Sequence, residues 1–373
     1  MENHTLLGLT TAAFGLLVYL VQPEPLRSIV LTNEITSIVF YVAIVALTLA
    51  FMRKAPEEHV DSNGKAVFIT GCDSGFGYNL AVRLDKLGFT VFAGCLMPDR
   101  EGARQLNEET SDKLHIVKVD VTDDWQVRGA LKYVKENLKD NVLWALVNNA
   151  GIAVFTEIEW CSVDQFQRVM DVNVFGVVRV TKAFLPLIRP SKGRVINVAS
   201  LAGRFTLPAF SAYSMSKKAC IAFSDGLRLE MAKFDVNVIT IEPGLYRTPI
   251  SSENYLIDMN RKSWAETPKE VKNDYGEEYF DAFLENITQQ MKRARPNTNE
   301  VVDLMVKAVT TSKPKQRYVP YWKSDVRAHI LMSLPSSITD KLFKAYTVKV
   351  EVESKRRASD KEKSNGTPSP KDK

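Results

Sequence analysis

The stretch from Ala66 to Gly77, AVFITGCDSGFG, joins a short apolar run to a turn that contains three glycines. Continuous β-branched and aromatic residues favour a strand buried on both faces, as in a parallel sheet. The glycines are spaced Gly-x-x-x-Gly-x-Gly, and a helix-length amphipathic segment follows them up to Leu87. A glycine turn between a strand and a helix leaves backbone N–H groups free to hold a phosphate. The same spacing also fits a plain tight turn, so the neighbouring segments are needed to distinguish a phosphate-binding turn from a plain one.

Further apolar runs follow this stretch and alternate with helix-length segments. The runs are Thr90–Leu96, Ile116–Val121, Trp144–Asn148, Arg194–Ser200 and Val236–Glu242, and helices are expected at Gly77–Leu87, Ser162–Leu187 and Ser211–Lys233. This alternation predicts an α/β fold, in which a doubly wound parallel sheet of the Rossmann type carries α-helices on both faces. Ligands of such sheets bind beyond the carboxyl ends of the strands, so functional motifs are expected there.

Polar motifs do follow the ends of these runs. Asn148-Asn149-Ala150-Gly151 closes the fourth run, Ser200 closes the fifth, and Asn173 lies inside a predicted helix. Asparagine is a poor helix former because its side chain competes with the helix backbone for hydrogen bonds. An asparagine among apolar neighbours inside a helix is therefore unusual. Tyr213 and Lys217 are one helical turn apart, a spacing that also fits a solvated helix face.

Taken together, these motifs resemble those of the short-chain dehydrogenase/reductase family. The resemblance covers about Asn63 to Tyr321 and rests on Thr70-Gly71-x-x-x-Gly75-x-Gly77, Asn148–Gly151, Asn173, Ser200, Tyr213-x-x-x-Lys217 and Pro243-Gly244. Each motif is weak alone, but their order and their places at strand ends make the set specific.

The resemblance implies four catalytic residues. Tyr213 exchanges the proton of the alcohol or ketone, and Ser200 hydrogen-bonds the carbonyl oxygen. Lys217 holds the nicotinamide ribose, and Asn173 anchors a water that links the lysine to solvent. A free phenol keeps its proton at neutral pH, and an ammonium group one turn away favours the phenolate.

The resemblance also implies a nicotinamide cofactor. The residues implied to bind it are Thr70, Gly71, Asp73, Ser74, Gly75, Phe76, Gly77, Asp120, Val121, Asn148, Ala150, Gly151, Tyr213, Lys217, Pro243, Gly244 and Thr248. Of these, Asp120 is expected beside the adenine, Asn148 beside the nicotinamide and Pro243–Thr248 beside the carboxamide. An acid at the end of the second strand would favour NAD and an arginine NADP, but Gly94-Cys95-Leu96 is neutral. NAD is preferred over NADP because similar family members mostly use it.

Two apolar runs without charged residues, 6–21 and 35–52, precede this fold. The second is long enough to span a bilayer and the first is marginal, although both also fit buried core helices. No basic residue precedes the first run and the first arginine is Arg27, so neither a secretory signal nor a mitochondrial presequence fits well. We expect residues 1–58 to form membrane helices. Arg53 and Lys54 then favour a cytosolic catalytic domain on the endoplasmic reticulum, with mitochondria as the alternative.

The rest of the chain divides into three predicted parts. Residues 59–322 form the catalytic domain with a substrate lid at about 250–296, residues 323–348 a C-terminal segment, and residues 349–373 a disordered charged tail. Aromatic residues of the lid either line an apolar pocket or belong to the core; they are Tyr255, Trp264, Phe280 and Phe283.

Composition excludes several classes of function. The net charge of +5 is mild and unclustered, which argues against a nucleic-acid partner. The four cysteines form no Cys-x-x-Cys pair, and no histidine lies near the motifs, so no metal site is expected. Family resemblance implies a homodimer or homotetramer built on Ser162–Leu187 and Ser211–Lys233.

The segments TGCDSGFG, WALVNNAG and GRVINVAS resemble the branch of retinol, 17-beta type hydroxysteroid and D-3-hydroxybutyrate dehydrogenases. The preferred function is a membrane-anchored NAD(P)-dependent oxidoreductase that interconverts an alcohol and its carbonyl on a steroid or retinoid, with membrane lipid as a partner. A mitochondrial D-3-hydroxybutyrate dehydrogenase is the alternative. A non-catalytic binding protein is disfavoured because all four catalytic positions are filled.

Overall fold

The computed structural model describes residues 42–43, 45–46, 58–249 and 252–365, with backbone alone for 360–365. The chain divides into two units, Met1–Glu58 and His59–Lys373. The first apolar run lies outside the described residues, and of the second only Val42, Ala43, Val45 and Ala46 are described, as helix. None of the helices in the described ranges combines the length and the apolar character needed to cross a membrane.

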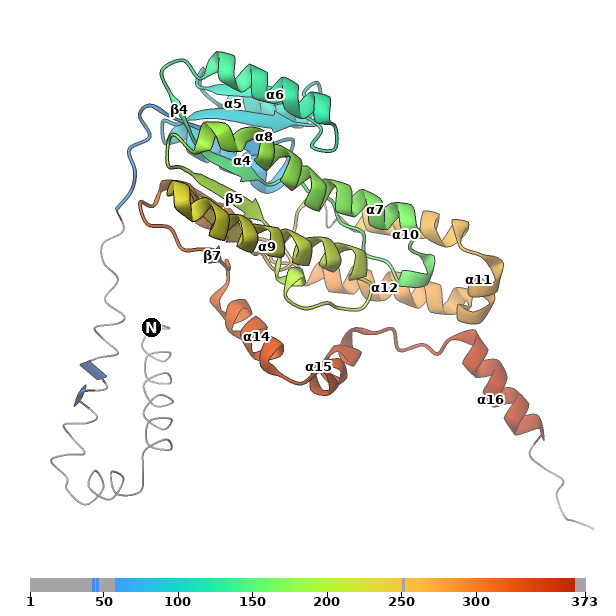
Figure 1. The fold of residues 1–373 in the computed structure, drawn as a ribbon. Coiled ribbons are helices and arrows are strands. Elements are labelled where there is room, and N and C mark those ends of the chain that lie inside the picture. Colours follow the sequence, from blue (N-terminus) through green and yellow to red (C-terminus); the bar gives the residue numbers. More distant parts are fainter. Residues whose placement is uncertain (1–41, 44, 47–57, 250–251, 366–373) are drawn as a thin grey trace, which may run out of the picture. The chain divides into compact units, whose positions relative to one another are not determined.

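Seven parallel strands form one sheet in the order β3-β2-β1-β4-β5-β6-β7 (Figure 1). Their bounds are β1 Lys65–Thr70, β2 Thr90–Cys95, β3 Leu114–Lys118, β4 Val142–Asn148, β5 Arg194–Val198, β6 Asn237–Ile241 and β7 Arg317–Tyr318. The six predicted strands are all present. The structure adds a seventh, β7, which was not predicted because a run of two residues shows no strand pattern in the sequence. The chain steps from β1 out to β3 and then returns to β4 beside β1. The switch point of the sheet is therefore between β1 and β4.

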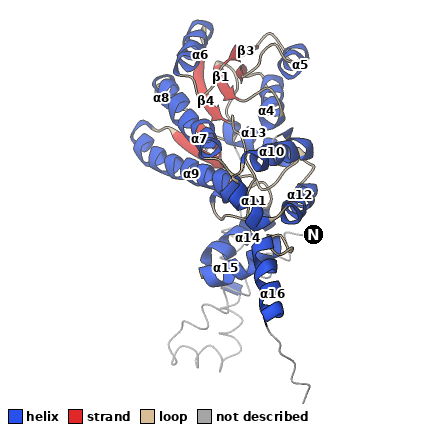
Figure 2. Ribbon diagram, turned by 90° about the vertical axis from the view of Figure 1, so that its right-hand side faces the viewer, coloured by secondary structure: helices blue, strands red, loops and turns tan. Residues whose placement is uncertain are grey.

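Helices cover both faces of this sheet (Figure 2). The helices α4, α5 and α13 pack on one face, and α6, α8 and α9 pack on the other. The α-helices of the second unit are α4 Gly75–Lys86, α5 Glu101–Glu109, α6 Asp124–Asn137, α7 Val163–Met170, α8 Val177–Ile188, α9 Ser211–Met231, α10 Glu253–Glu266, α11 Lys269–Tyr275, α12 Glu277–Lys292, α13 Asn299–Thr310, α14 Trp322–Ser333, α15 Ser336–Phe343 and α16 Glu353–Asn365.

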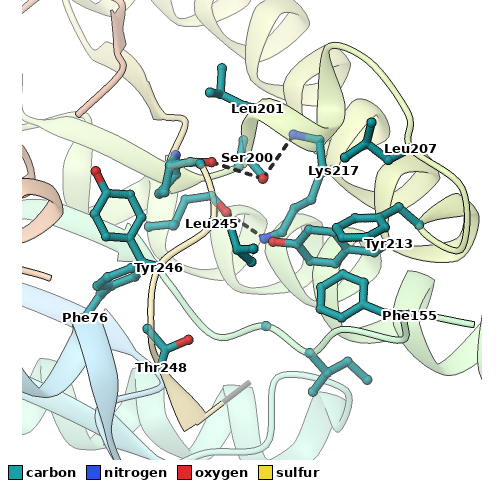
Figure 3. Close-up of a pocket in the computed structure, with 18 of the residues that line it drawn as sticks. Phe76, Phe155, Ser200, Leu201, Leu207, Tyr213, Lys217, Leu245, Tyr246 and Thr248 are labelled. Carbon is teal, nitrogen blue, oxygen red and sulfur yellow. Dashed lines mark hydrogen bonds between the residues drawn. The ribbon is translucent and has the colours of Figure 1, made fainter. Parts of the chain in front are cut away.

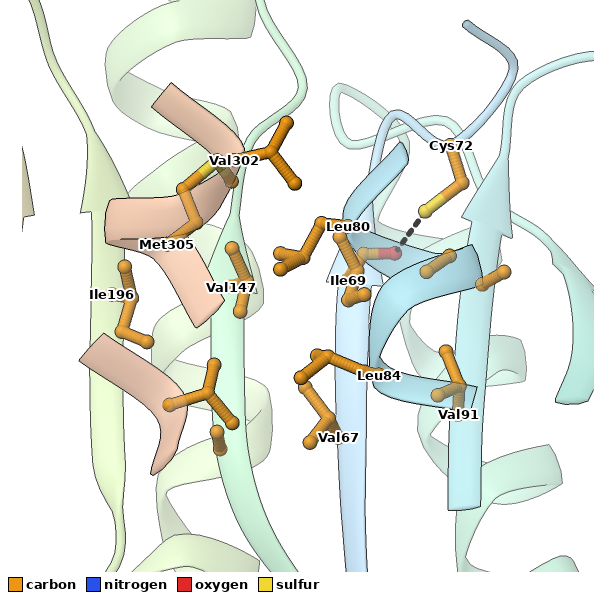
Figure 4. Packing of buried hydrophobic residues seen from close by; sticks show 14 of the residues in the cluster. Val67, Ile69, Cys72, Leu80, Leu84, Val91, Val147, Ile196, Val302 and Met305 are labelled. Atoms are coloured by element: carbon orange, nitrogen blue, oxygen red, sulfur yellow. Dashed lines mark hydrogen bonds between the residues drawn. The ribbon is translucent and has the colours of Figure 1, made fainter. Parts of the chain in front are cut away.

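The alternation of side chains along β1 divides the core into two layers. Val67 and Ile69 face α4 and α13, where they meet Leu80, Leu84, Val302 and Met305 (Figure 4). Phe68 points to the other face and stacks on Phe184 of α8, with ring centres 4.4 Å apart. Since both faces of the strand are buried, an uninterrupted apolar run is the sequence that this position requires.

The helix predicted at Ser162–Leu187 is interrupted in the structure. A π-helical turn, η2 (Asp171–Gly176), separates α7 from α8, and it contains Asn173. The Asn173 side chain bonds to the backbone of Ile152 rather than to its own helix. An extra residue in one helical turn is a frequent device at functional sites.

The charged tail predicted as disordered forms a helix over part of its length. It contains α16, in which Arg357 and Glu353 form a pair one turn apart. Arg356 also pairs with Glu278 at the start of α12. Residues 353–363 are nearly all Glu, Lys, Arg, Ala and Ser, and most of these are good helix formers.

Three of the four aromatic residues in the predicted lid are core residues. Trp264, Phe280 and Phe283 are at most 5% exposed and pack around Trp160. Tyr255 is 48% exposed. The question left open by the sequence is thus answered in favour of the core for the three buried rings.

Candidate active site

The glycine turn after β1 lies at the switch point and has the shape of a phosphate cradle. Gly71 has a φ of +73°, and a Cβ there would lie 2.8 Å from Cα of Ala150. A Cβ on Gly77 would lie 2.3 Å from the Gly71 carbonyl oxygen. Ser74, the N-cap of α4, makes no side-chain cap, and the first turn has no acidic residue. The first N–H groups of α4 therefore remain available, as binding of a dinucleotide pyrophosphate requires.

Asn149 ties the ends of β1 and β4 together. Its Nδ2 donates to the carbonyls of Thr70, at 2.9 Å, and Gly71, at 3.0 Å. In return Thr70 Oγ1 accepts from the backbone N–H groups of Asn149 and Ala150, both at 3.1 Å. The sequence showed Asn149 as part of a motif but gave no role for its side chain.

Asn148 is buried at the end of β4. It is 2% exposed and is not among the residues that line the cavity. Its Nδ2 donates to Thr181 of α8 at 2.9 Å and to Asn197 of β5 at 2.8 Å. These contacts join β4 to α8 and β5. The expected contact of Asn148 with the nicotinamide side stays a prediction.

Asp73 supplies the acidic group that the end of β2 lacks. Its carboxylate accepts from the backbone N–H groups of Leu96 and Met97, each at 2.9 Å. Both residues directly follow β2, so the glycine turn places a carboxylate at the strand end. An acid at this place is the group that binds the ribose hydroxyl of NAD in dinucleotide-binding folds.

Ser200, Tyr213 and Lys217 meet on one wall of the cavity (Figure 3). Ser200 follows β5 and caps η3 (Leu201–Gly203), while Tyr213 and Lys217 lie on α9. Lys217 is 5% exposed, and its Nζ donates to the carbonyl of Val198 at 2.8 Å. The same Nζ is 5.7 Å from the centre of the Tyr213 ring. A cation beside the phenol is thus present, as the Tyr-x-x-x-Lys spacing predicts.

The Ser200 hydroxyl both donates and accepts a hydrogen bond within the protein. It donates to the Pro243 carbonyl at 3.1 Å and accepts from the Ala202 N–H at 3.1 Å. The Pro243 oxygen also accepts from the N–H of Leu201 at 2.9 Å. Ser200 can therefore turn its proton toward a ligand without leaving that carbonyl unpaired.

Asn173 lies behind this wall, fully buried, and is not among the residues that line the cavity. Its side chain accepts from the N–H of Ile152 at 2.9 Å and donates to the Ile152 carbonyl at 2.8 Å. It also donates to Ser216, next to Lys217, at 3.0 Å. The contacts join the loop after β4 to α9.

The cavity has a volume of 1210 Å³ and brings most of the predicted site together. The predicted residues that line it are Gly71, Asp73, Ser74, Gly75, Phe76, Asp120, Val121, Ala150, Gly151, Ser200, Tyr213, Lys217, Pro243, Gly244 and Thr248. Thr70, Gly77, Asn148 and Asn173 support the walls without lining them. Asp120 is held by the Thr122 hydroxyl at 2.7 Å.

The outer end of the cavity is formed by a segment for which the sequence gave no role. Residues of α14, α15 and the following turn line it, including Leu331, Leu334, Leu342, Phe343 and Tyr346. From the predicted lid, Gln290, Arg293 and Arg295 reach the cavity. An apolar run such as ILMSLP near residue 330 is the signal in the sequence that could have shown this wall.

Comparisons with known proteins agree with this fold and this set of motifs. The profile of the family described as short chain dehydrogenase matches residues 65–258. The chain is 40% identical to mitochondrial D-beta-hydroxybutyrate dehydrogenase of Rattus norvegicus over 291 residues, which covers 76% of this chain and 84% of that protein. It is 40% identical to 17-beta-hydroxysteroid dehydrogenase type 6 of Homo sapiens, covering 74% and 86%, and 39% identical to retinol dehydrogenase 7 of Mus musculus, covering 83% and 98%.

Solved structures show the same fold. A short-chain dehydrogenase from Streptomyces avermitilis superimposes with a TM-score of 0.59 at 24% identity, over 75% of this chain and 96% of that one. One from Burkholderia phymatum, in complex with NAD, gives 0.59 at 20% identity, over 72% and 93%.

The chain belongs to the short-chain dehydrogenase/reductase family. It is an NAD(P)-dependent oxidoreductase that acts on alcohol groups.

Proposed function

We propose that this protein interconverts a primary or secondary alcohol and its carbonyl on a lipophilic substrate, a steroid or a retinoid. The observation that carries the proposal is the cavity itself, in which Ser200, Tyr213 and Lys217 share a wall with an apolar outer end. The named steroid and retinol relatives support the substrate class.

The chain's own residues divide the work on the reacting oxygen. Tyr213 moves a proton at its phenol oxygen, and Ser200 donates a hydrogen bond to the substrate oxygen. Lys217 would bind the nicotinamide ribose, and Asn173 holds the loop at Ile152 against α9. A nicotinamide dinucleotide, when bound, would accept or supply the hydride.

NAD is the proposed cofactor, and Asp73 supports it. The fixed carboxylate can accept a hydrogen bond from a ribose hydroxyl, whereas it would repel a 2′-phosphate. The glycine turn and the uncapped start of α4 fit the pyrophosphate.

The predicted anchor, lid and assembly stay proposals. Residues 1–58 would hold the enzyme on the endoplasmic reticulum, where a lipophilic substrate is dissolved, and about 250–296 would cover the substrate. Exposed apolar side chains on α7, η2 and α9 support pairing of two or four chains on these helices; they are Val163, Phe175, Met215 and Leu229.

A hydroxybutyrate dehydrogenase is the second candidate. Its support is the 40% identity to proteins of that name and two cationic side chains at the cavity, Arg293 and Arg327. Neither guanidinium forms an ion pair with a described residue, so either could receive a carboxylate.

Initial rates of NADH formation with estradiol, retinol and D-3-hydroxybutyrate, repeated with NADP, test these alternatives. Turnover of the steroid or the retinoid with NAD supports the leading proposal. Turnover of hydroxybutyrate alone, lost when Arg293 and Arg327 are both changed to alanine, would favour the second.

A further inference from the structure

A buried carboxylate lies directly behind the catalytic serine. Glu242 is fully buried between the end of β6 and Pro243. It accepts from Arg204 Nε at 2.5 Å, from Arg317 at 3.2 Å and from Thr240 Oγ1 at 2.9 Å. A charge is retained in such a place only where partners of opposite charge surround it.

The two arginines extend this contact into a charge cluster. Arg317 forms two hydrogen bonds to Asp225 of α9, at 2.6 and 2.7 Å. Arg204, whose side chain is 8% exposed, reaches Asp325 of α14 at 3.3 Å. The cluster therefore connects η3, β6, β7, α9 and the C-terminal segment that forms the outer cavity wall.

Within the charge cluster, Arg204 is the residue that connects to the turn carrying Ser200. Arg204 ends η3, the short turn that Ser200 begins, and its N–H donates to Leu201 at 2.9 Å. At the other side of the turn, a Cβ on Gly203 would lie 2.8 Å from the backbone of Lys217. The η3 turn is thus packed between the Glu242 carboxylate and α9, the helix that carries Tyr213 and Lys217.

We propose that Glu242 is a positioning residue for the reaction, acting through Arg204. By fixing the η3 turn, the pair sets the place of the Ser200 hydroxyl relative to Tyr213 and Lys217. Glu242 also precedes Pro243, whose carbonyl holds the Ser200 hydroxyl. The inference rests on the proposed function, in which Ser200 donates to the substrate oxygen.

A purely structural cluster makes a different prediction. It would lower stability whichever carboxylate is removed, with no preference for Glu242. Asp225 offers the matched comparison, because it binds Arg317 from the other side and makes no contact with Arg204.

The test compares Glu242→Gln, Arg204→Lys and Asp225→Asn in the full-length protein. The substrate is the alcohol among estradiol, retinol and D-3-hydroxybutyrate that the wild type oxidises, and binding of NADH is followed by fluorescence. We expect kcat to fall about 10- to 100-fold for the first two variants, since a small misplacement of a positioning group has that effect. The Kd for NADH should stay at the wild-type value, and Asp225→Asn should keep the wild-type kcat.

Wild-type kcat in Arg204→Lys, or an equal loss in Asp225→Asn, would overturn the inference. Arg204→Lys keeps a positive charge beside Glu242 and so decides the question even if Glu242→Gln does not fold. Ser200→Ala separates the two proposals in the same assay. If Ser200→Ala keeps its turnover, the proposed function fails; if it loses turnover while Arg204→Lys does not, only the positioning role fails.

Discussion

Asp73 shows how a side chain of the glycine turn reaches the strand end at which an acidic group is expected to favour NAD. It belongs to the glycine turn, yet both carboxylate oxygens bind the backbone just after β2. The position that selects the cofactor in dinucleotide-binding folds is thus occupied by a residue from a neighbouring strand end.

Changing Asp73 to asparagine should shift cofactor preference with little change in shape. Without the negative charge, the ratio of the Kd for NADPH to the Kd for NADH should fall about tenfold, which is roughly 1.4 kcal/mol. Fluorescence titration with each reduced cofactor measures this ratio. Asp99→Asn is the matched control, since Asp99 is exposed, follows shortly after the end of β2 and is not part of the cavity wall. An unchanged ratio in Asp73→Asn would remove the argument for NAD.

For single residues, the sequence predicted which side chains meet at the cavity better than which groups each of them contacts. Motif and spacing placed Ser200, Tyr213 and Lys217 at strand and helix positions that the fold brings together. The Asp73 carboxylate is fixed by the backbone after β2, and the Asn148 amide bonds to Thr181 of α8; both contacts are made by elements distant in the sequence. Such contacts are set by tertiary packing, which no local pattern encodes.

Among the elements, the strand–turn–helix unit of β1 and α4 is the part that defines the cofactor end of the cavity. Gly77 is a helix residue with no freedom to carry a side chain, because the Gly71 oxygen and the Asn149 amide lie within 2.5 Å of its missing Cβ. Gly129, inside α6, has no neighbour within 4 Å of the same atom.

The two helical glycines should therefore respond oppositely to alanine. Gly77→Ala should lower the free energy of unfolding by about 1–3 kcal/mol through overpacking and should weaken NADH binding. Gly129→Ala should raise it by about 0.5–1 kcal/mol because alanine is the better helix former. Thermal or urea unfolding of both variants checks the signs. A stabilised Gly77→Ala with normal NADH affinity is incompatible with the cradle described above.

Elements with a strong periodic pattern were predicted well, and interrupted ones were not. Six strands follow from their apolar runs, whereas β7 has only two residues and the helix at Ser162–Leu187 contains a π turn. Within the π turn, the Asn173 side chain bonds to Ile152, a residue 21 positions earlier. The hydrophobic pattern continues across the turn, so it gives no sign of the break.

For the whole molecule, the C-terminal segment completes the cavity. Helix α14 follows β7 at one edge of the sheet (Figure 1), and its residues line the same cavity as the family motifs. The walls of one cavity are thus supplied by parts of the chain more than 200 residues apart, Gly71 and Leu331 for example.

Two adjacent residues of α14 test whether this wall meets the substrate. Leu331 lines the cavity, whereas Met332 does not and is 57% exposed. Leu331→Gln should raise the KM for retinol or estradiol about tenfold, since an apolar contact with the ligand is lost. Met332→Gln should leave KM unchanged. Steady-state kinetics measures KM for both variants. Equal KM values in the two variants would contradict a lipophilic substrate at this wall.

Tyr213 is proposed as the acid and base that exchanges a proton with the substrate oxygen, and the Tyr213→Phe variant tests this role. The variant removes only the phenol oxygen and keeps the ring against Phe155, where the ring centres are 5.4 Å apart. We expect kcat/KM to fall about 100- to 10,000-fold, the usual worth of a positioned proton donor, with the Kd for NADH unchanged. Full turnover in Tyr213→Phe would show that Tyr213 is not the proton donor and acceptor of the reaction.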